Sequence, residues 1–445
     1  MKTVDMLNGR LLPNIVRFSL PIMIADLLQI CFNTADTMIV GRFCGQQALA
    51  AVGGAAPVLV LFTWSLSGVA MGTNVYVSRL LGEGDEEGVR RAVHTSVFLA
   101  VLLGTAVSLA GIAGARFLLQ VMSVPAEIID ASALYLRIYF LAVLPIALFD
   151  FSAAILRADG DSAHPTVYLG IAGALNVVLN LLFVIAFHWD TAGVALASVL
   201  SQILSVILIL RKLTRLREPL RLFPSRIRID RECAAAVLKI GLPSALQNSL
   251  YSLTNVAVQS SINSFGTAAV AANSAANAIE EYVYIALGGF NQAALTFTGQ
   301  NTGAGQYKRI VRILIMTLIL SGISGALIGW GGYLGGTFFL SMFTAQPQVI
   351  QNGMIRLAYV TRWLFLNGLL ECFVSSIRGM GVSFLPTAVT LTGIAGFRLL
   401  YIAFWFQAHP DLQTLYLCFP LSWLITLAAQ AVLWFFTYRK YGGRQ

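Results

Sequence analysis

Leu156-Arg157-Ala158-Asp159-Gly160-Asp161-Ser162-Ala163-His164-Pro165-Thr166 recurs as Ile377-Arg378-Gly379-Met380-Gly381-Val382-Ser383-Phe384-Leu385-Pro386-Thr387. The two segments share Arg, Gly, Ser, Pro and Thr at a constant offset, 378 − 157 = 221, which is close to half of the 445 residues. Gly82-Glu83-Gly84 returns at the same offset as Gly303-Ala304-Gly305. An internal repeat constrains the architecture before any other feature is considered. A mostly apolar unit of this length predicts a duplicated membrane bundle.

The composition excludes an ordinary soluble domain. Hydrophobic residues make up 57% of the chain and charged residues 11%, whereas a soluble domain carries about 25% charged residues. Apolar runs of about 20 residues, enough to cross a hydrocarbon layer of about 30 Å, recur along the whole chain. The runs are continuous rather than alternating, which argues against a β-barrel. We therefore predict an all-α integral membrane protein with twelve transmembrane helices, at 14–41, 48–75, 91–114, 131–156, 165–188, 192–212, 237–264, 268–296, 309–333, 348–376, 385–407 and 412–438.

The repeat also predicts the domain organisation. Six spans is an even number, so the second repeat enters the membrane in the same direction as the first. The prediction is an N-terminal six-helix lobe at 1–212, a basic cytoplasmic linker at 213–231 and a C-terminal six-helix lobe at 232–445. Such parallel repeats bind substrate in the central cleft between the halves and alternate access by rocking.

The net charge of +9 is placed mainly in the predicted inner loops and in the linker. This positive-inside asymmetry predicts cytoplasmic N- and C-termini in a multi-pass membrane protein. The basic linker is expected to contact anionic lipid head groups rather than nucleic acid. Besides membrane lipid, the expected partners are small organic substrates, and the chain is expected to be a monomer.

No resident cofactor is predicted. The five cysteines, Cys31, Cys44, Cys233, Cys372 and Cys418, show no CxxC spacing, so neither a metal site nor a disulfide framework is expected. No glycine-rich phosphate-binding loop precedes a basic helix, so ATP is not the expected energy source.

A polar stripe runs along the first span. Asp26, Gln29, Asn33 and Asp36 are spaced by 3, 4 and 3 residues, which places them on one helical face. A charged group at the centre of a membrane helix costs roughly 2.5–3.5 kcal/mol, so an intramembrane carboxylate is a functional candidate. Interhelical hydrogen bonding is the alternative for the amide groups.

The seventh span repeats the stripe without an acid, as Asn248, Ser252, Asn255, Gln259 and Asn263, and Val258 stands at the repeat position of Asp36. Ion coupling is therefore expected in the N-terminal half. We predict an ion-coupling site made of Asp36 with Asn33, Asn176 and Asn180, at which Na⁺ is a possible ligand.

The eighth span carries Asn273, Asn277, Glu280 and Tyr284 on one face, with Glu281 beside it. Glu280 is expected either to take up a proton or attract a cationic substrate, or to form a satisfied intramembrane hydrogen bond. The predicted substrate cavity consists of Gln29, Asn255, Gln259, Asn273, Asn277, Glu280 and Tyr284.

The remaining intramembrane charges have structural interpretations. Asp150 and Glu371 each precede a repeated arginine, Arg157 or Arg378, by seven residues and are predicted to form structural pairs with it. Arg398 is expected to be paired or to snorkel, and it is the clearest membrane-buried cation of the sequence.

Four motifs in order resemble the multidrug and toxic compound extrusion (MATE) family, in particular its DinF-like bacterial group. Asn33-Thr34-Ala35-Asp36-Thr37-Met38-Ile39-Val40-Gly41 resembles the D-T-x-x-x-G signature of the first helix, and Ala48-Leu49-Ala50-Ala51 resembles the opening of the second. The Arg157 segment resembles the loop before helix five, and the segment from Ala293 to Gly305 resembles the end of helix eight. The resemblance covers nearly the whole chain.

This resemblance implies a V-shaped exporter with two six-helix lobes, driven by inward H⁺ or Na⁺, with Asp36 as the coupling residue. The family's fifth-helix pattern G-A-L-N-x-x-x-D reads here Gly173-Ala174-Leu175-Asn176-Val177-Val178-Leu179-Asn180. Its final Asp has become Asn180, which removes a second titratable group from this lobe.

Three functions follow from these features. The first is a secondary active multidrug exporter that exchanges H⁺ or Na⁺ for amphipathic, often cationic, organic compounds. The alternative is a lipid-linked oligosaccharide or lipid flippase of the same superfamily, which would need several basic residues in its cavity. A membrane enzyme or a channel is the third, but His94, His164, His188 and His409 lie far apart in the sequence, so we expect no enzyme.

Overall fold

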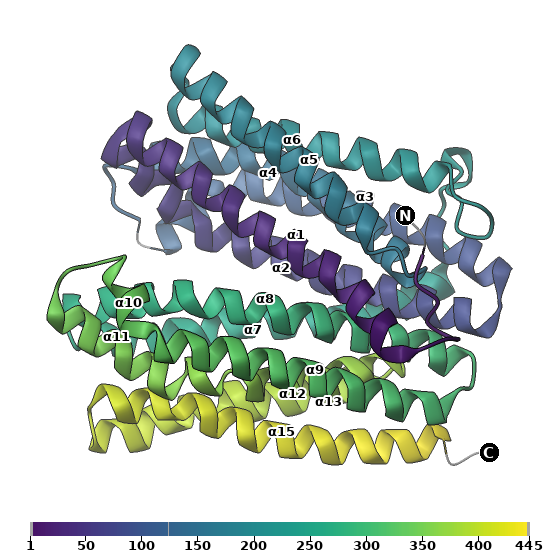
Figure 1. Ribbon diagram of the computed structural model, residues 1–445. Helices are drawn as coiled ribbons and strands as arrows, with labels where there is room; N and C mark the ends of the chain where they lie inside the picture. Colours follow the sequence, from purple (N-terminus) through teal and green to yellow (C-terminus); the bar gives the residue numbers. More distant parts are fainter. Residues whose placement is uncertain (1–2, 123, 443–445) are drawn as a thin grey trace. The chain divides into compact units, whose positions relative to one another are not determined.

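The computed structural model describes residues 3–122 and 124–442, and within them every regular element is helical (Figure 1). The α-helices of the first repeat are α1 (Leu11–Ile39), α2 (Gly45–Glu83), α3 (Glu86–Val121), α4 (Ile129–Ala158), α5 (Ala163–Leu181) and α6 (Asp190–Thr214). Those of the second repeat are α7 (Arg231–Asn263), α8 (Thr267–Gly303), α9 (Tyr307–Leu334), α10 (Gly336–Ser341), α11 (Pro347–Tyr359), α12 (Phe365–Gly379), α13 (Phe384–Thr390), α14 (Phe397–Leu400) and α15 (Leu412–Gly442).

Short π- and 3₁₀-helical segments join or extend these helices. The π-helical segments are η1 (Val40–Cys44), η2 (Leu182–Ala186), η5 (Leu391–Gly396) and η6 (Tyr401–Phe406), and the 3₁₀ turns are η3 (Pro224–Arg226) and η4 (Thr361–Trp363). The tenth span is thus α11, η4 and α12 in succession, and the eleventh runs from α13 through η6.

The predicted twelve-span, all-α fold is confirmed. Nine stretches of the described chain are long and apolar enough to cross a membrane, and the first of them, Leu11–Glu83, contains both α1 and α2. Helices α7 and α8 complete the twelve; their polar stripes lower the hydropathy of otherwise membrane-length helices. At about 1.5 Å per residue, the 39 residues of α2 reach well beyond a hydrocarbon layer of about 30 Å.

The chain forms two compact units that exchange the starts of two helices. The N-terminal unit comprises Met1–Val4 and Ile24–Ala245, and the C-terminal unit comprises Asp5–Met23 and Leu246–Gln445. The first part of α1 therefore packs with the C-terminal unit, and the first part of α7 packs with the N-terminal one. The sequence analysis predicted no such exchange. Its division into lobes at 1–212 and 232–445, joined by a linker at 213–231, stays a prediction.

Repeated glycines have the same backbone conformation in both halves. Gly84 and Gly305, 221 residues apart, have φ of 73° and 68°, and Gly160 and Gly381, at the same offset, have φ of 85° and 88°. These left-handed values favour glycine because it lacks a Cβ. Gly84 ends α2, and its N–H donates to the carbonyls of the preceding turn. The repeated motifs of the sequence are thus the turns that close the same helix ends twice.

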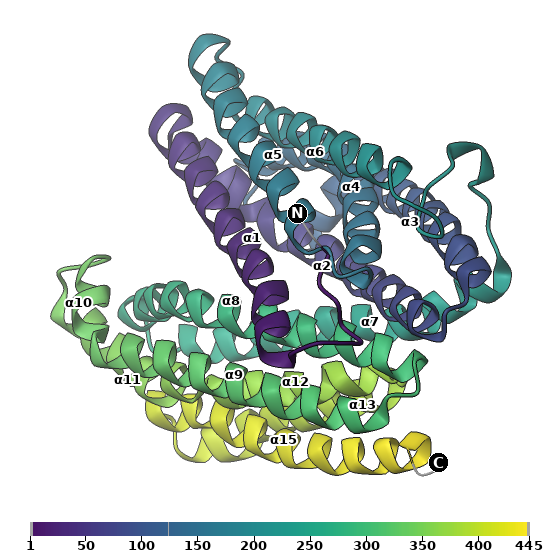
Figure 2. The same cartoon turned by 45° about the vertical axis from the view of Figure 1, so that its right-hand side comes forward.

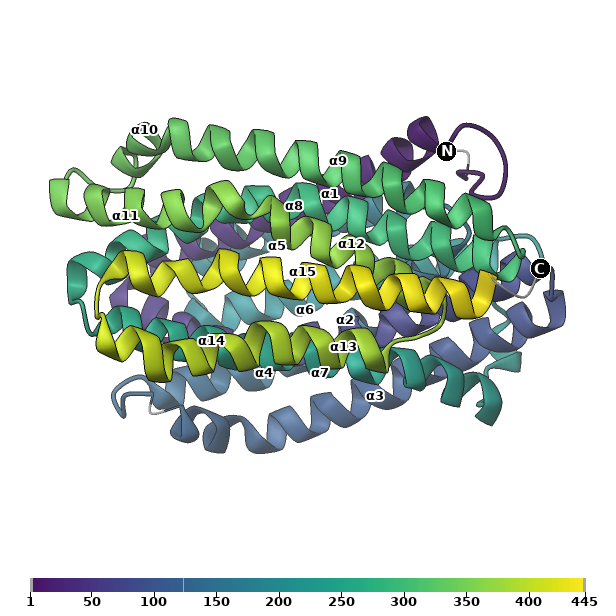
Figure 3. The ribbon, with the colours of Figure 1, turned by 90° about the horizontal axis from the view of Figure 1, so that it is seen from below.

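Each unit has its own packed core. In the N-terminal unit α4 packs against α2, α3 and α6, with Phe140 and Phe151 fully buried, and α5 lies beside α6 (Figure 2). In the C-terminal unit α8 packs against α9, α11 and α12. Helix α15 lies between α11 and α12 on one side and α13 and α14 on the other (Figure 3), where it buries Tyr416 and Trp423.

The repeated motif at residues 156–166 spans the turn between α4 and α5. The Asp161 carboxylate accepts hydrogen bonds from the backbone N–H of His164 at 3.1 Å and from its Nδ1 at 2.6 Å. Lys212 Nζ lies 3.9 Å from the same carboxylate. Burial raises the pKa of neighbouring Asp159 to about 6, with Asp161 adding to the shift and Lys212 opposing it. These contacts indicate that the motif has a structural role, which is to stabilise the turn between α4 and α5.

Helix α2 approaches the start of α7 closely at a glycine, and this gives a first prediction. A Cβ on Gly72 would lie 2.2 Å from the Val237 carbonyl oxygen and 2.9 Å from the Gly241 nitrogen. Both obstacles are backbone atoms, so Gly72→Ala is expected to destabilise the N-terminal unit by roughly 1–3 kcal/mol. The midpoint of thermal unfolding of purified protein measures this change. Gly114→Ala in α3 is the control, because no atom outside its own turn lies within 4 Å of that Cβ. Equal midpoints for the two variants would contradict the close contact.

Candidate functional site

The N-terminal unit brings Asp36 of α1 to two asparagines of α5. Asn180 Nδ2 donates to Asp36 Oδ1 at 2.5 Å. With its NH₂ group toward the carboxylate, Asn176 donates to Asp36 Oδ1 at 2.8 Å and Oδ2 at 3.3 Å, while its own oxygen accepts from the Ser198 N–H at 3.3 Å. Three of the four residues predicted for ion coupling therefore form one cluster.

Local backbone features position this cluster. Gly173 of α5 faces Phe32 of α1 so closely that a Cβ there would lie 1.9 Å from the ring, which allows the two helices to approach. The π-helical segment η1 begins four residues after Asp36, and η2 begins two residues after Asn180. Segments of this kind are frequent at functional sites, because their wider turn breaks the regular hydrogen-bond ladder.

The chemistry of the cluster suits a proton or a small hard cation. Asn180 is fully buried, and its Oδ1 has no hydrogen-bond partner among the described residues. An unsatisfied amide oxygen beside a carboxylate offers the oxygen ligands that such cations prefer. The phenols of Tyr135 and Tyr139 lie within electrostatic range of Asp36. Within the described ranges, no group of three or more His, Cys, Asp or Glu side chains could hold a metal ion.

The structure does not join the rest of the first-helix stripe to Asp36. Asn33 is exposed and accepts a hydrogen bond from Gln29 Nε2 at 3.2 Å. A spacing of three residues leaves Asn33 roughly 60° around the helix from Asp36, so both share a broad face but point differently. The role predicted for Asn33 therefore stays a prediction.

In the C-terminal unit, Glu280 of α8 forms a buried ion pair with Arg356 of α11. Arg356 Nε and Nη2 donate to the two carboxylate oxygens at 2.9 and 2.8 Å, and the two side chains are 7% and 5% exposed. Thr361 Oγ1 adds a hydrogen bond to Glu280 Oε1 at 3.0 Å. This bidentate contact, with two parallel N–H···O hydrogen bonds, is the strongest geometry for an arginine–carboxylate pair. The charge of Glu280 is thus neutralised within the chain.

A chain of amides continues from this ion pair. Arg356 Nη1 donates to Asn273, whose Nδ2 donates to Gln259 Oε1 at 2.9 Å. Gln259 Nε2 in turn donates to Asn263 Oδ1 at 2.9 Å. The other residues predicted for the substrate cavity of this unit, Asn255, Asn277 and Tyr284, are exposed. The side chain of Ser252 lies outside the described residues.

Sequence reasoning missed Arg356 as the partner of Glu280. The sequence did indicate that Arg356 needs a partner, because it lies within the predicted span 348–376 and an intramembrane charge requires one. Nothing in the 76-residue separation of Glu280 and Arg356, however, indicated that these two residues pair.

The structure refines two structural interpretations of the sequence. Asp150 interacts electrostatically with Arg157, as expected, but its hydrogen-bond donor is Ser67 Oγ. Arg398 is paired, as one of the two alternatives had it, but with Ser422 Oγ, to which Nε donates at 3.0 Å, and with the ring of Phe419, on which its guanidinium stacks. Sequence spacing reports a shared face but not which side chain completes a contact.

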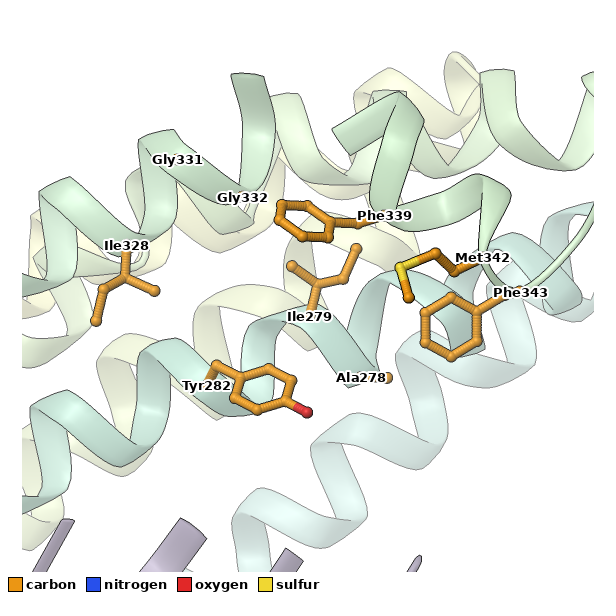
Figure 4. Close-up of a pocket in the computed structure, with 9 residues that line it drawn as sticks. All are labelled: Ala278, Ile279, Tyr282, Ile328, Gly331, Gly332, Phe339, Met342 and Phe343. Atoms are coloured by element: carbon orange, nitrogen blue, oxygen red, sulfur yellow. The ribbon is translucent and has the colours of Figure 1, made fainter. Parts of the chain in front are cut away.

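A large apolar cavity of about 780 Å³ lies elsewhere in the C-terminal unit (Figure 4). Its walls come from α8, α9 and the α10 segment, and the residues that line it are Ala278, Ile279, Tyr282, Ile328, Gly331, Gly332, Phe339, Met342 and Phe343. Tyr282 contributes the hydroxyl group seen in Figure 4. This lining can accommodate apolar groups but lacks the charged groups needed for ion coupling, so the polar clusters, and not this cavity, are the candidate site.

Comparison with known proteins agrees with the repeat. The MatE family profile matches residues 21–182 and 243–403, one match in each repeat, and the first includes Asp36, Asn176 and Asn180. The chain belongs to the MatE family. Members of this family are transporters, so the chain is a multi-pass membrane transporter and not an enzyme.

Relatives match along nearly the whole chain. The probable multidrug resistance protein YoeA of Bacillus subtilis is 26% identical over 421 residues, which cover 92% of this chain and 90% of YoeA. The probable multidrug resistance protein NorM of Thermotoga maritima is 23% identical, over 86% of this chain and 83% of its own. The outward-facing structure of a multidrug resistance MATE family transporter superposes with a TM-score of 0.90 at 20% identity and covers 99% of both chains.

Proposed function

We propose that this transporter exports amphipathic organic compounds from the cytoplasm in exchange for H⁺ or Na⁺. Relatives that match over most of the chain are named as multidrug resistance proteins, which supports multidrug export. We also propose that the protein lies in the bacterial cytoplasmic membrane with both termini in the cytoplasm. The motifs quoted above support its assignment to the DinF-like group.

The observation that carries the proposal is the Asp36–Asn176–Asn180 cluster. Its carboxylate is partly buried and accepts a hydrogen bond from a fully buried asparagine that also presents a free amide oxygen. Binding of a cation there removes a net negative charge from the membrane interior. The loaded and empty sites therefore favour different packings of α1 against α5, and a ligand shifts such an equilibrium only by its differential affinity for the two states. Moving one charge through 100 mV supplies about 2.3 kcal/mol for this work.

The coupling ion is tested in proteoliposomes. Purified protein is reconstituted, and uptake of a fluorescent amphipathic dye is followed with a proton gradient alone, with a Na⁺ gradient alone and with neither. Antiport predicts concentrative uptake under one of the gradients and none without a gradient. Equal uptake under all three conditions would contradict ion coupling.

A second candidate, a lipid or lipid-linked oligosaccharide flippase, gains support from the buried cations. Such a substrate needs several basic residues for its pyrophosphate, and the C-terminal unit buries Arg356, Arg378 and Arg398 with 4–5% exposure. Arg356 is engaged by Glu280, however, and Arg378 donates to Gln247 and Thr387, so two of the three are bound by side chains of the protein itself. Accumulation of a lipid-linked precursor after deletion of the gene would favour this second function.

A further inference from the structure

Arg398 is a buried positive charge of the C-terminal unit that belongs to neither polar cluster. It lies in α14, between the two π-helical segments η5 and η6 of the eleventh span, and is 5% exposed. A charged side chain at this depth of a membrane helix costs roughly 2.5–3.5 kcal/mol and marks a functional site by default.

The contacts of Arg398 leave half of its guanidinium unused. Phe419 lies 4.1 Å and Trp423 5.7 Å from Cζ, measured to the ring centroids, so the aromatic rings cover the faces of the group. Nε donates to Ser422 Oγ at 3.0 Å. Among the described residues no oxygen accepts a hydrogen bond from Nη1 or Nη2. These two donors have the forked geometry that binds a carboxylate or a phosphate through two parallel hydrogen bonds.

Among the described residues, Arg398 forms no ion pair with a carboxylate. The groups that act on its charge most strongly are Cys418, the phenols of Tyr284 and Tyr251, and Arg356. Glu280 is held by Arg356, and Glu371 accepts from Tyr251 at 3.3 Å. Within the described part of the C-terminal unit, Arg398 is thus a cation without a carboxylate partner.

The repeat places this cation at the counterpart of the ion-coupling cluster. At the offset of 221, Asn176 corresponds to Phe397 and Asn180 to Tyr401, so Arg398 directly follows the counterpart of Asn176. Segment η6 begins at Tyr401, and η2 begins two residues after Asn180. Arg398 itself corresponds to Val177 of α5, so the second repeat has a cation beside the positions of Asn176 and Asn180, whereas the carboxylate of Asp36 comes from α1.

We propose that Arg398 binds an anionic group of the exported compound, so that the substrates include amphipathic aromatic compounds bearing a carboxylate, sulfonate or phosphate. The proposal rests on export of organic compounds as the function of this site. Tyr284, which is 45% exposed, provides an aromatic surface in the same unit against which a flat substrate can pack. From the sequence, Glu280 was expected either to take up a proton or attract a cationic substrate, or to form a satisfied hydrogen bond; in the structure it is paired with Arg356.

Two xanthene dyes of opposite charge test this proposal in the full-length protein in lipid nanodiscs. Fluorescein carries a carboxylate and is anionic, whereas rhodamine 6G is cationic, and binding of each is followed by fluorescence polarisation without any ion gradient. Wild-type protein is expected to bind fluorescein more tightly than rhodamine 6G. In Arg398→Gln, which keeps a donor near Ser422 but loses the charge, fluorescein affinity is expected to fall at least about tenfold, while rhodamine 6G affinity is unchanged or rises.

The matched control is Arg362→Gln in the same unit. Arg362 lies among the rings of Trp330, Tyr333 and Trp363 at 5.4–5.9 Å, and its removal is expected to leave the ratio of the two affinities unchanged. A wild-type preference for rhodamine 6G, or an Arg398→Gln variant with the wild-type affinity ratio, would overturn the proposal.

A further variant covers misfolding. If Arg398→Gln shows no cooperative thermal unfolding, Arg398→Lys is measured in its place. Lysine keeps the charge but loses the forked guanidinium, so the affinity for fluorescein is expected to fall severalfold relative to that for rhodamine 6G. An unchanged ratio of the two affinities would overturn the proposal. Because binding is measured without a gradient, its failure is distinct from a failure of ion-coupled export, which the proteoliposome assay detects separately.

Discussion

Asp36→Asn is expected to abolish concentrative export while leaving the protein folded and in the membrane. The amide is nearly isosteric with the carboxylate, so contacts with Asn176 and Asn180 can re-form, but the group no longer gains or loses charge. A gradient of 100 mV acting on one charge is worth about 2.3 kcal/mol, which supports roughly a 50-fold accumulation. The variant is expected to accumulate no dye above equilibrium in proteoliposomes, and cells that produce it should lose resistance.

Asp130→Asn is the control for this experiment. Asp130 belongs to the same unit, but its carboxylate is exposed and pairs with Arg116 at 3.0 Å, a contact worth at most about 1 kcal/mol. Wild-type accumulation is expected. Full resistance and accumulation in the Asp36 variant, at equal protein levels, would refute the coupling role.

Arg356→Gln is expected to produce the largest loss of stability in the C-terminal unit. It leaves Glu280 buried without its ion-pair partner, and breaking a buried pair from one side costs roughly 3–5 kcal/mol. Asn273 also loses the donor from Arg356. The midpoint of thermal unfolding in nanodiscs should therefore fall clearly below that of the wild type.

The double variant Glu280→Gln/Arg356→Gln tests the reason for that loss. Because it removes both charges, it is expected to be more stable than Arg356→Gln alone, and the double-mutant cycle yields the coupling energy of the pair. Additive losses from the two single variants would show that the ion pair contributes nothing, and Glu280 would again be available for a cationic substrate.

The helices and their duplication could be predicted because both depend on local sequence. Each apolar run needs only its own length to form a spanning helix, and glycines such as Gly84 and Gly305 specify the same turn in each half. The π-helical segments and the break at Thr361–Trp363 could not be predicted, because the packing of neighbouring helices favours them over regular α-helix.

The candidate site likewise has a part that could be predicted from the sequence and a part that could not. Asp36, Asn176 and Asn180 were predicted together because intramembrane polar groups need partners and because the resemblance to MATE transporters makes these fifth-helix residues the partners of the first-helix acid. The pairing of Glu280 with Arg356 and the stacking of Arg398 on Phe419 depend on which helix faces which, and no spacing within one helix contains that information. Arg398 is the clearest case, because its unpaired edge is visible only once every neighbour is known.

Ion movement driven by substrate in the absence of any imposed ion gradient tests the central claim most directly. Proteoliposomes loaded with dye and diluted into dye-free buffer are monitored with an internal pH indicator and an internal Na⁺ indicator. For the wild type, we predict that dye efflux drives one of the two ions inward, and that Asp36→Asn releases dye without moving either ion. An Asp36→Asn protein that moves as many ions per dye molecule as the wild type would contradict the account.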